Sequence, residues 1–266
     1  MLAASAQNSR RSKTGAGLCL ALLSLTILVS ANGAELKAQP VTVSSEGWML
    51  RGDLVTPVDA TASAVALLLH KAAGDRTAYE EMAAALGERG IASLRIDLRG
   101  HGDSTNLGAF DPELSRYFDA SDPAVVRNFD LIRAGDRDVV AVVKWIREQP
   151  AFTGLPLLVV GSSYTGEEMA EAGAEIGYAD VYVALAPGNF SEDSIQSIDA
   201  SGAPWLFVRA EIELPFFPAL FESIEEGSEI AEIWVLPGEG HATDLFDTNP
   251  ELHVDLIEWI EAKLSQ

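Results

Sequence analysis

The stretch from Leu157 to Gly166 constrains the fold of this chain more than any other. It opens with four apolar residues, two of them β-branched, and such a run is typical of a buried strand. The small and polar segment Gly-Ser-Ser-Tyr-Thr-Gly follows at once and leads into residues 167–172, whose composition favours a helix. A strand that turns sharply into a helix holds a serine at the top of a sheet, backed by a helix N-terminus.

Ser163 is the serine that this turn presents. The strained backbone needs small residues two positions before and after the serine, because larger side chains crowd it. Gly161 satisfies this requirement, whereas Ser162 would have Val160 in that position. Thr165 stands where glycine is usual, with a glycine one place later, so the pattern Gly-x-Ser-x-Gly is met only in part. The motif alone is explained equally well by a simple turn between strand and helix.

Further apolar runs alternate with helical segments along the rest of the chain. Residues 41–45 and 48–56 alternate in polarity around Glu46-Gly47, which is typical of a β-hairpin. We expect further strands at 65–69, 91–96, 181–185, 205–208 and 233–236, and helices at 77–86, 136–148 and 252–264. This alternation predicts one α/β domain with about eight mostly parallel strands, an antiparallel N-terminal hairpin and helices on both faces.

The first 34 residues have the layout of a secretory signal peptide. Basic residues precede the apolar run Leu18 to Val29, and small residues follow it at 31, 33 and 34. The run is too short to span a bilayer comfortably, so we expect no stable membrane anchor after cleavage. We therefore predict export to the periplasm or the medium, removal of residues 1–34, and one α/β domain at 35–266.

The exported chain would be strongly acidic and free of cysteine. The whole sequence has 40 Asp and Glu against 18 Lys and Arg, and no acidic residue lies among the first 34. Such a surface repels nucleic acid and anionic membranes, so neither is an expected partner. The only cysteine, Cys19, lies near the start of the apolar run, whereas a lipid-anchor cysteine would end it. We expect no disulfide, so the domain must be held by its core.

An acid and a histidine follow the elbow serine at the ends of later strands. The strand at 204–210 leads to Glu211 and Glu213, and His241 lies just past the following strand in a Gly-rich loop. Ligands of an open α/β sheet bind at the carboxyl ends of its strands, where all of these groups are expected. The order serine, acid, histidine is that of α/β-hydrolases.

The chain resembles the α/β-hydrolase superfamily over essentially its whole mature length. The matching stretches are His-Lys-Ala-Ala-Gly at 70–74, Asp-Leu-Arg-Gly-His-Gly-Asp-Ser at 97–104, Gly-Ser-Ser-Tyr at 161–164 and Gly-Glu-Gly-His at 238–241. The Gly-Ser-Ser-Tyr elbow and the short path from Val181 to Trp205 are most similar to small, capless, dienelactone-hydrolase-like members. The resemblance implies the α/β-hydrolase fold and a catalytic triad.

Each residue of this set would have a role in acyl transfer. His241 would take the proton of the Ser163 hydroxyl and return it to the leaving group, while a carboxylate orients the imidazole. The backbone N–H groups of Tyr164 and of Lys71 or Ala72 would hold the oxyanion, each contributing about 3 kcal/mol. Lys71 replaces the glycine that is usual after the preceding histidine, so we expect an oxyanion loop of different shape.

We predict that the triad acid is Glu213 rather than Glu211. In the family pattern the acid follows the small residue that ends its strand by three positions, and Ala210 is that small residue here. Pro215 suits the turn that such an acid occupies, and Glu211 would leave the strand too early. The alternative is that either glutamate is a solvated residue of a chain that has many.

The other histidines and nearby glutamates have structural explanations. We expect His70 and His101 to brace loops beside the site, and His253 to be structural. Glu167 and Glu168 suit the positive end of the helix dipole, although they could also weaken oxyanion stabilisation. The sequence has neither the residue spacing of a metal site nor a Gly-rich phosphate loop, so no metal or cofactor is implied.

Together these features predict a secreted serine hydrolase that cleaves a small-molecule carboxylic ester through an acyl-enzyme. The same machinery serves amidases, thioesterases, lactonases and acyltransferases. An alternative from another class is a catalytically silent hydrolase fold that acts as a binding protein, which the non-glycine residues Thr165 and Lys71 favour slightly.

The size of the site depends on two segments. No long cap intervenes between Val181 and Trp205, so we expect an open site that prefers short or medium acyl chains. Residues 106–128 lack clear periodicity but carry Phe110, Tyr117 and Phe118. These aromatic residues could form a small lid over the site or fill a satellite core beside the sheet, and the sequence favours neither.

Overall fold

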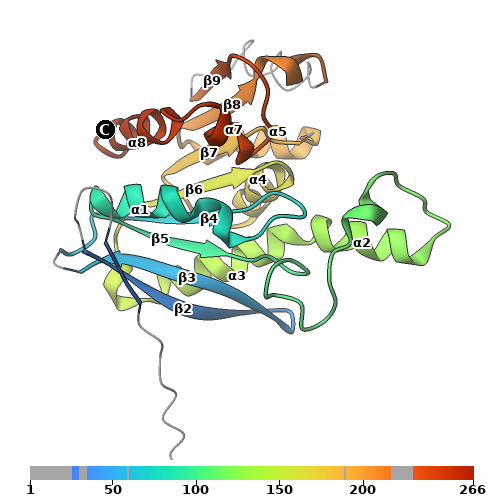
Figure 1. Cartoon of the computed structure of the whole chain (residues 1–266), viewed down its shortest axis with the longest axis horizontal. Coiled ribbons are helices and arrows are strands. Elements are labelled where there is room, and N and C mark those ends of the chain that lie inside the picture. The colour runs from blue at the N-terminus through green and yellow to red at the C-terminus, as the bar shows by residue number, and fades with distance from the viewer. Residues whose placement is uncertain (1–25, 30–34, 59, 189, 217–229) are drawn as a thin grey trace, which may run out of the picture.

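A mixed sheet with helices on both faces forms the body of the molecule (Figure 1). The computed structural model describes residues 26–29, 35–58, 60–188, 190–216 and 230–266. Its strands lie in the order β1-β2-β3-β5-β4-β6-β7-β8-β9. They are β1 (Thr26–Val29), β2 (Glu35–Ser45), β3 (Trp48–Pro57), β4 (Ala64–Leu69), β5 (Ile91–Ile96), β6 (Leu157–Ser162), β7 (Val181–Leu185), β8 (Trp205–Ala210) and β9 (Ala231–Leu236).

The predicted antiparallel hairpin is confirmed as β2 and β3. Ser45 pairs with Trp48 across a two-residue turn, in which Glu46 and Gly47 have φ values of 47° and 89°. Two successive positive φ values are typical of the tight turns that join twisted strands. β2 begins at Glu35, earlier than the alternating pattern indicated; residues 35–38 pair with β1, and the strand pairs with β3 from Leu36 on.

β1 is a ninth strand that the sequence did not predict. It lies within the predicted signal peptide and pairs antiparallel with the start of β2, from Val29 opposite Glu35 to Thr26 opposite Ala38. The basic residues, Cys19 and the small residues of that predicted signal peptide lie outside the described residues.

The remaining strands are parallel, and all of them except the edge strand β9 are buried on both faces, which explains their continuous apolar runs. On one face, Leu67 and Val159 pack in one cluster with residues of α3 and α4; on the other, Leu68 and Val160 pack with residues of α1 and α8. The helices of the described chain are α1 (Glu80–Glu88), α2 (Pro123–Arg133), α3 (Gly135–Arg147), α4 (Tyr164–Ile176), α5 (Glu192–Ser201), α7 (Asp244–Thr248) and α8 (Leu252–Leu264). None of them is long and apolar enough to cross a membrane.

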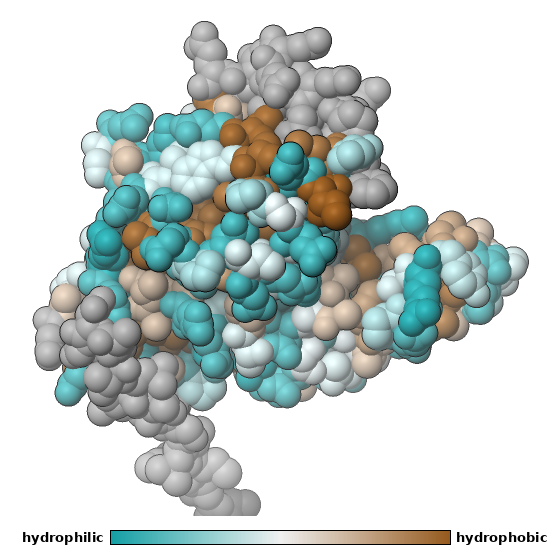
Figure 2. Space-filling view, turned by 45° about the horizontal axis from the view of Figure 1, so that its top comes forward, coloured by the Kyte–Doolittle hydropathy of each residue, from teal (hydrophilic) through white to brown (hydrophobic). Residues whose placement is uncertain are grey.

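Residues 106–133 form an arm that projects from the right of the body in Figure 1 and includes α2. The aromatic residues Phe110, Tyr117 and Phe118 of the arm do not gather into one group. Phe110 stacks on His101 with ring centroids 4.7 Å apart, Phe118 packs edge-on against Phe129, and the Tyr117 side chain is 73% exposed. The surface of the arm carries both hydrophilic and hydrophobic residues (Figure 2).

Candidate active site

Ser163 occupies a strained turn between β6 and α4. Its φ of 56° and ψ of −125° are rarely adopted by a residue with a side chain. Three backbone hydrogen bonds hold this conformation. The Ser163 N–H donates to the Leu185 carbonyl over 3.0 Å, and its carbonyl accepts from the N–H groups of Gly166 and Gly188 over 3.0 and 3.2 Å. The surrounding backbone therefore fixes the serine at the carboxyl end of the sheet.

The two elbow positions at which glycine is usual, 161 and 165, are accommodated in different ways. A Cβ on Gly161 would lie 2.7 Å from the Thr165 carbonyl oxygen, so a larger residue would force the turn open. Thr165 is fully buried at the place where glycine is usual, and its Oγ1 lies 3.1 Å from the Leu69 carbonyl. The close approach has moved to Gly166, where a Cβ would lie 2.7 Å from that of Pro187. The partial motif thus forms a complete turn.

Ser163, His241 and Glu213 lie in one chain of hydrogen bonds. His241 Nε2 is 2.9 Å from Ser163 Oγ, and His241 Nδ1 is 2.7 Å from Glu213 Oε1. The three residues come from the loops or turns that follow β6, β9 and β8, and so meet at one end of the sheet. Glu211, the other acid considered, is exposed. With Nδ1 donating to the carboxylate, the free Nε2 lone pair faces the serine hydroxyl.

A buried arginine that the sequence analysis missed supports the Glu213 carboxylate. The Arg209 side chain is fully buried near the end of β8, and its Nη1 lies 3.4 Å from Glu213 Oε2. Its Nη2 donates to the Pro187 carbonyl in the loop after β7. Burial lowers the pKa of Arg209, and the Glu213 charge opposes that shift. The two Glu213 oxygens are therefore divided between a histidine and an arginine.

The predicted oxyanion amides belong to segments that adjoin Ser163. Tyr164 is the first residue of α4, whose N-terminal N–H groups have no partner within the helix. Lys71 and Ala72 follow the end of β4, where Leu69 lies opposite Gly161 of β6. The two strand ends are also linked by a 3.0 Å hydrogen bond from Ser162 Oγ to the Leu69 carbonyl.

His70 is a buried brace of the loop after β4. Its Nδ1 lies 2.8 Å from the Lys71 carbonyl, and its Nε2 accepts the Leu98 N–H over 3.1 Å. Burial lowers the pKa of His70 to about 4, so the ring is neutral at pH 7, as an acceptor nitrogen requires.

His101 packs beside the site through its ring faces. It stacks on Phe110 and, at a centroid distance of 6.0 Å, on Tyr164. Its Nδ1 is 3.0 Å from the Arg99 carbonyl, and burial lowers the pKa of His101 to about 4. His253, the third histidine outside the hydrogen-bonded set, stacks on Phe246 with centroids 3.9 Å apart.

Glu168 does not add a negative charge beside the site at neutral pH. Its side chain is buried, and Oε2 accepts the Asp136 N–H at the start of α3 over 2.7 Å. Burial raises the pKa of Glu168 to about 9, so the carboxyl is protonated at pH 7. Burial also raises the pKa of Glu167, whose Oε1 accepts the Ser191 N–H over 3.2 Å. Both glutamates therefore serve packing between neighbouring helices and loops.

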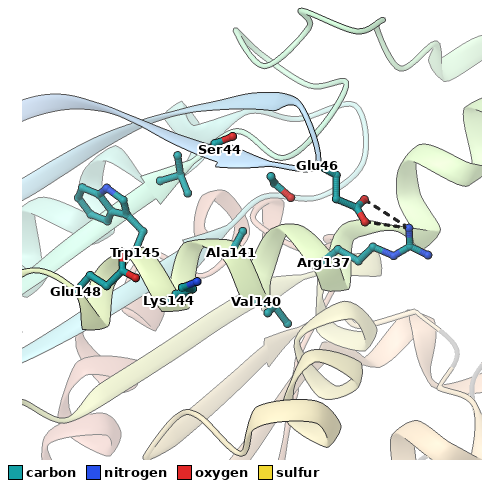
Figure 3. A pocket seen from close by; sticks show the side chains of 10 residues that line it. Ser44, Glu46, Arg137, Val140, Ala141, Lys144, Trp145 and Glu148 are labelled. Atoms are coloured by element: carbon teal, nitrogen blue, oxygen red, sulfur yellow. Dashed lines mark hydrogen bonds and ion pairs between the residues drawn. The ribbon is translucent and has the colours of Figure 1, made fainter.

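A cavity of about 530 Å³ lies between α3 and the β2–β3 hairpin, away from these residues (Figure 3). Trp145, Val140 and Ala141 face it from α3, and an ion pair of 3.4 Å between Arg137 and Glu46 crosses one end. None of the predicted site residues lines it. Among the described residues, no group of three or more His, Cys, Asp or Glu side chains could hold a metal ion.

Comparisons with known proteins identify the fold. No protein-family model matches the chain, and a search of curated protein sequences finds no match either. Dienelactone hydrolase from Anabaena variabilis superposes with a TM-score of 0.65 at 20% identity, over 86% of this chain and 97% of its own.

Two further solved structures agree with this result. Est1E from Butyrivibrio proteoclasticus, with bound ferulic acid, gives a TM-score of 0.63 at 16% identity, over 85% of this chain and 100% of its own. An α/β serine hydrolase homologue from Coxiella burnetii gives a TM-score of 0.61 at 18% identity, over 82% of this chain and 95% of its own. The expected fold is thus confirmed, and the chain has the α/β-hydrolase fold.

Proposed function

We propose that this protein is a serine hydrolase that cleaves carboxylic esters through an acyl-enzyme. The observation that carries this proposal is the hydrogen-bonded series of Ser163, His241 and Glu213 on a strained elbow. The solved structures that share the fold include a dienelactone hydrolase and esterases, which supports ester hydrolysis over amide or thioester chemistry.

Acylation begins at the 2.9 Å contact between Ser163 Oγ and His241 Nε2. As Oγ attacks the ester carbonyl carbon, Nε2 takes its proton, and the Glu213 carboxylate stabilises the resulting imidazolium through Nδ1–H. The negative charge moves to the former carbonyl oxygen, where the N–H groups of Tyr164 and of Lys71 or Ala72 receive it. The tetrahedral intermediate expels the alkoxide, which leaves as the alcohol after taking the proton from His241.

Deacylation repeats these steps with water in place of the serine. His241 takes a proton from the water as its oxygen attacks the acyl carbonyl, and it returns that proton to Ser163 Oγ when the carboxylic acid leaves. No group other than water and the described side chains is needed to balance the reaction.

The same observations weaken the alternative of a silent binding protein. Thr165 and Lys71 were the residues that favoured it. Thr165 forms part of the turn through its hydrogen bonds, so the missing glycine does not open the elbow. Lys71 forms an ion pair with Asp244, so its side chain has a structural role of its own. A strained serine backbone has a cost of about 1–3 kcal/mol and is expected where the side chain must be presented for chemistry.

We further propose that residues 1–34 direct the chain for export and that the site accepts small esters with short or medium acyl chains. The basic, apolar and small residues at the N-terminus support export. The segment between β7 and β8 holds one short helix, α5, and no long cap, which supports an open site.

The proposed activity is tested with p-nitrophenyl esters of graded acyl length. We expect hydrolysis of acetate to octanoate esters by the wild-type protein and loss of at least about 10³-fold in kcat for Ser163→Ala. Ser162→Ala is the matched control, because its hydroxyl donates to the Leu69 carbonyl and interacts with the buried Tyr79, outside the series of Ser163, His241 and Glu213. Equal activity of the wild-type protein and Ser163→Ala would exclude Ser163 as the nucleophile, and activity confined to long-chain lipids would exclude the open site.

A further inference from the structure

An ion pair joins the loop of the predicted oxyanion amides to the loop of His241. Lys71 Nζ lies 2.5 Å from Asp244 Oδ1, although the two residues are 173 positions apart in the sequence. Lys71 follows β4, whereas Asp244 begins α7 after β9, and three strands separate β4 from β9 in the sheet. The contact therefore bridges segments that the sheet itself does not hold together.

The backbone at Lys71 is fixed before its side chain leaves the loop. Its carbonyl accepts the Gly74 N–H over 3.0 Å and lies 2.8 Å from His70 Nδ1. Ala73 has a φ of 58°, so the loop closes through a left-handed residue. The ion pair therefore connects Asp244 to a loop whose backbone is already held in place.

Asp244 is tied equally closely to His241. The Asp244 N–H donates to the His241 carbonyl over 3.0 Å, and the Leu245 N–H donates to that of Ala242 over 3.2 Å. Ala242 has a φ of 57° and is fully buried, so this turn is also tightly defined. A displacement of the Asp244 side chain would therefore move the backbone that carries the imidazole.

We propose that the Lys71–Asp244 ion pair is a latch that sets the position of the oxyanion amides relative to His241. Both are positioning residues, and the inference rests on the proposed function. It also gives a reason for a lysine at position 71, because glycine there has no side chain to reach Asp244.

The latch is expected to affect rate more than stability. The side chains of Lys71 and Asp244 are 26% and 52% exposed, so solvent screens the pair and its loss should barely change the unfolding midpoint. A shift of about 1 Å in reacting groups, by contrast, can cost up to about 100-fold in rate. We expect Lys71→Met and Asp244→Asn each to lower kcat by about 3- to 10-fold with little change in KM.

Double-mutant and rescue measurements separate positioning from a general structural effect. If the two side chains act only through each other, the variant with both substitutions should lose no more kcat than either single variant. Lys71→Arg keeps the charge and should recover part of the rate lost in Lys71→Met. Arg89→Met is the matched control, because Arg89 forms an ion pair of 2.8 Å and similar exposure with Glu261 outside the site.

Amide hydrogen exchange supplies a readout that does not need turnover. Each single substitution should increase exchange in both loops, at residues 70–74 and 240–245, while Arg89→Met changes neither. Unchanged kcat in both site variants, additive losses in the double variant, or exchange raised only around the mutated residue would each overturn the latch. If the wild-type protein hydrolyses no ester, the proposed function fails, and the exchange in the two loops alone decides whether the pair couples them.

Discussion

Glu213 Oε1 and His241 Nδ1 are 2.7 Å apart, and the Glu213 side chain is 15% exposed at the edge of the site. A carboxylate at this distance holds the imidazole in the tautomer whose Nε2 can accept the Ser163 proton. The contact separates the roles of two glutamates that lie two positions apart in the sequence. Glu211, although closer to the end of β8, is exposed to solvent.

Replacing each glutamate in turn tests this distinction. Glu213→Gln should lower kcat strongly, by up to about 10⁴-fold as found for the corresponding acid of a serine protease triad, because the amide favours the wrong tautomer. Glu211→Gln should change kcat less than about twofold. Initial rates on one ester, measured at matched circular dichroism, check both. Full activity of the first variant and loss in the second would reverse the assignment.

Arg209 should tune the pH dependence of catalysis. Its guanidinium lies 3.4 Å from Glu213 Oε2. Its positive charge therefore offsets part of the negative charge with which Glu213 stabilises the protonated imidazole. Removing this positive charge in Arg209→Met should favour imidazolium and move the acid limb of the kcat/KM profile to higher pH. The profile is compared with that of the wild-type protein below the unfolding temperature of the variant. An acid limb at unchanged pH would show that Arg209 only fills space.

Thr165→Gly should restore the usual elbow pattern and yet destabilise this protein. The Thr165 hydroxyl accepts the Ser162 N–H over 2.6 Å in a fully buried position, and that donor would lose its partner. An unsatisfied buried donor lowers the free energy of unfolding by about 1–3 kcal/mol. Glycine lowers it further, because it raises the backbone entropy of the unfolded chain. Urea unfolding checks the loss, with Thr165→Ser as the control that keeps the hydroxyl. Equal stability of the glycine variant and the wild-type protein would contradict the assigned role.

Glu168 should make the fold less stable as the pH rises. Its pKa is about 9 in the folded chain against an ordinary value of 4.5, because burial disfavours the charged form. Between these values the unfolded chain has lost the proton that the folded chain keeps, so this residue's contribution falls with increasing pH. Glu168→Gln should therefore gain stability relative to the wild-type protein from pH 5 to pH 9. Glu258→Gln, on the exposed face of α8, is the control. If the stabilities of Glu168→Gln and the wild-type protein changed with pH in parallel, the raised pKa of Glu168 would be contradicted.

The sequence predicted the features that depend on local pattern. Continuous apolar runs located the central strands, and Glu46-Gly47 located the hairpin turn, because burial on two faces and positive φ values restrict the residue types allowed. Gly161 likewise marked Ser163 as the elbow serine, since only a glycine tolerates the 2.7 Å approach of the Thr165 carbonyl.

The features that the sequence did not predict depend on tertiary contacts. α2 and α5 were not predicted from the sequence, although Val125 and Leu131 give α2 a buried apolar side. The Lys71–Asp244 contact joins two loops, and the Arg209–Pro187 contact joins β8 to the loop after β7; no local pattern records such a pairing. A charged residue inside a strand, such as Arg209, was the available signal, because a buried charge needs a partner.

The most direct test of the account is covalent labelling with a fluorophosphonate, followed by peptide mapping of the folded protein. We expect one adduct, on Ser163, which forms much more slowly in His241→Ala and is absent in Ser163→Ala, since only an activated serine attacks such a phosphorus centre. Ser162→Ala should still be labelled at Ser163. An adduct on another residue, or no adduct on wild-type protein whose fold is intact, would contradict the claim that Ser163 is a catalytic nucleophile.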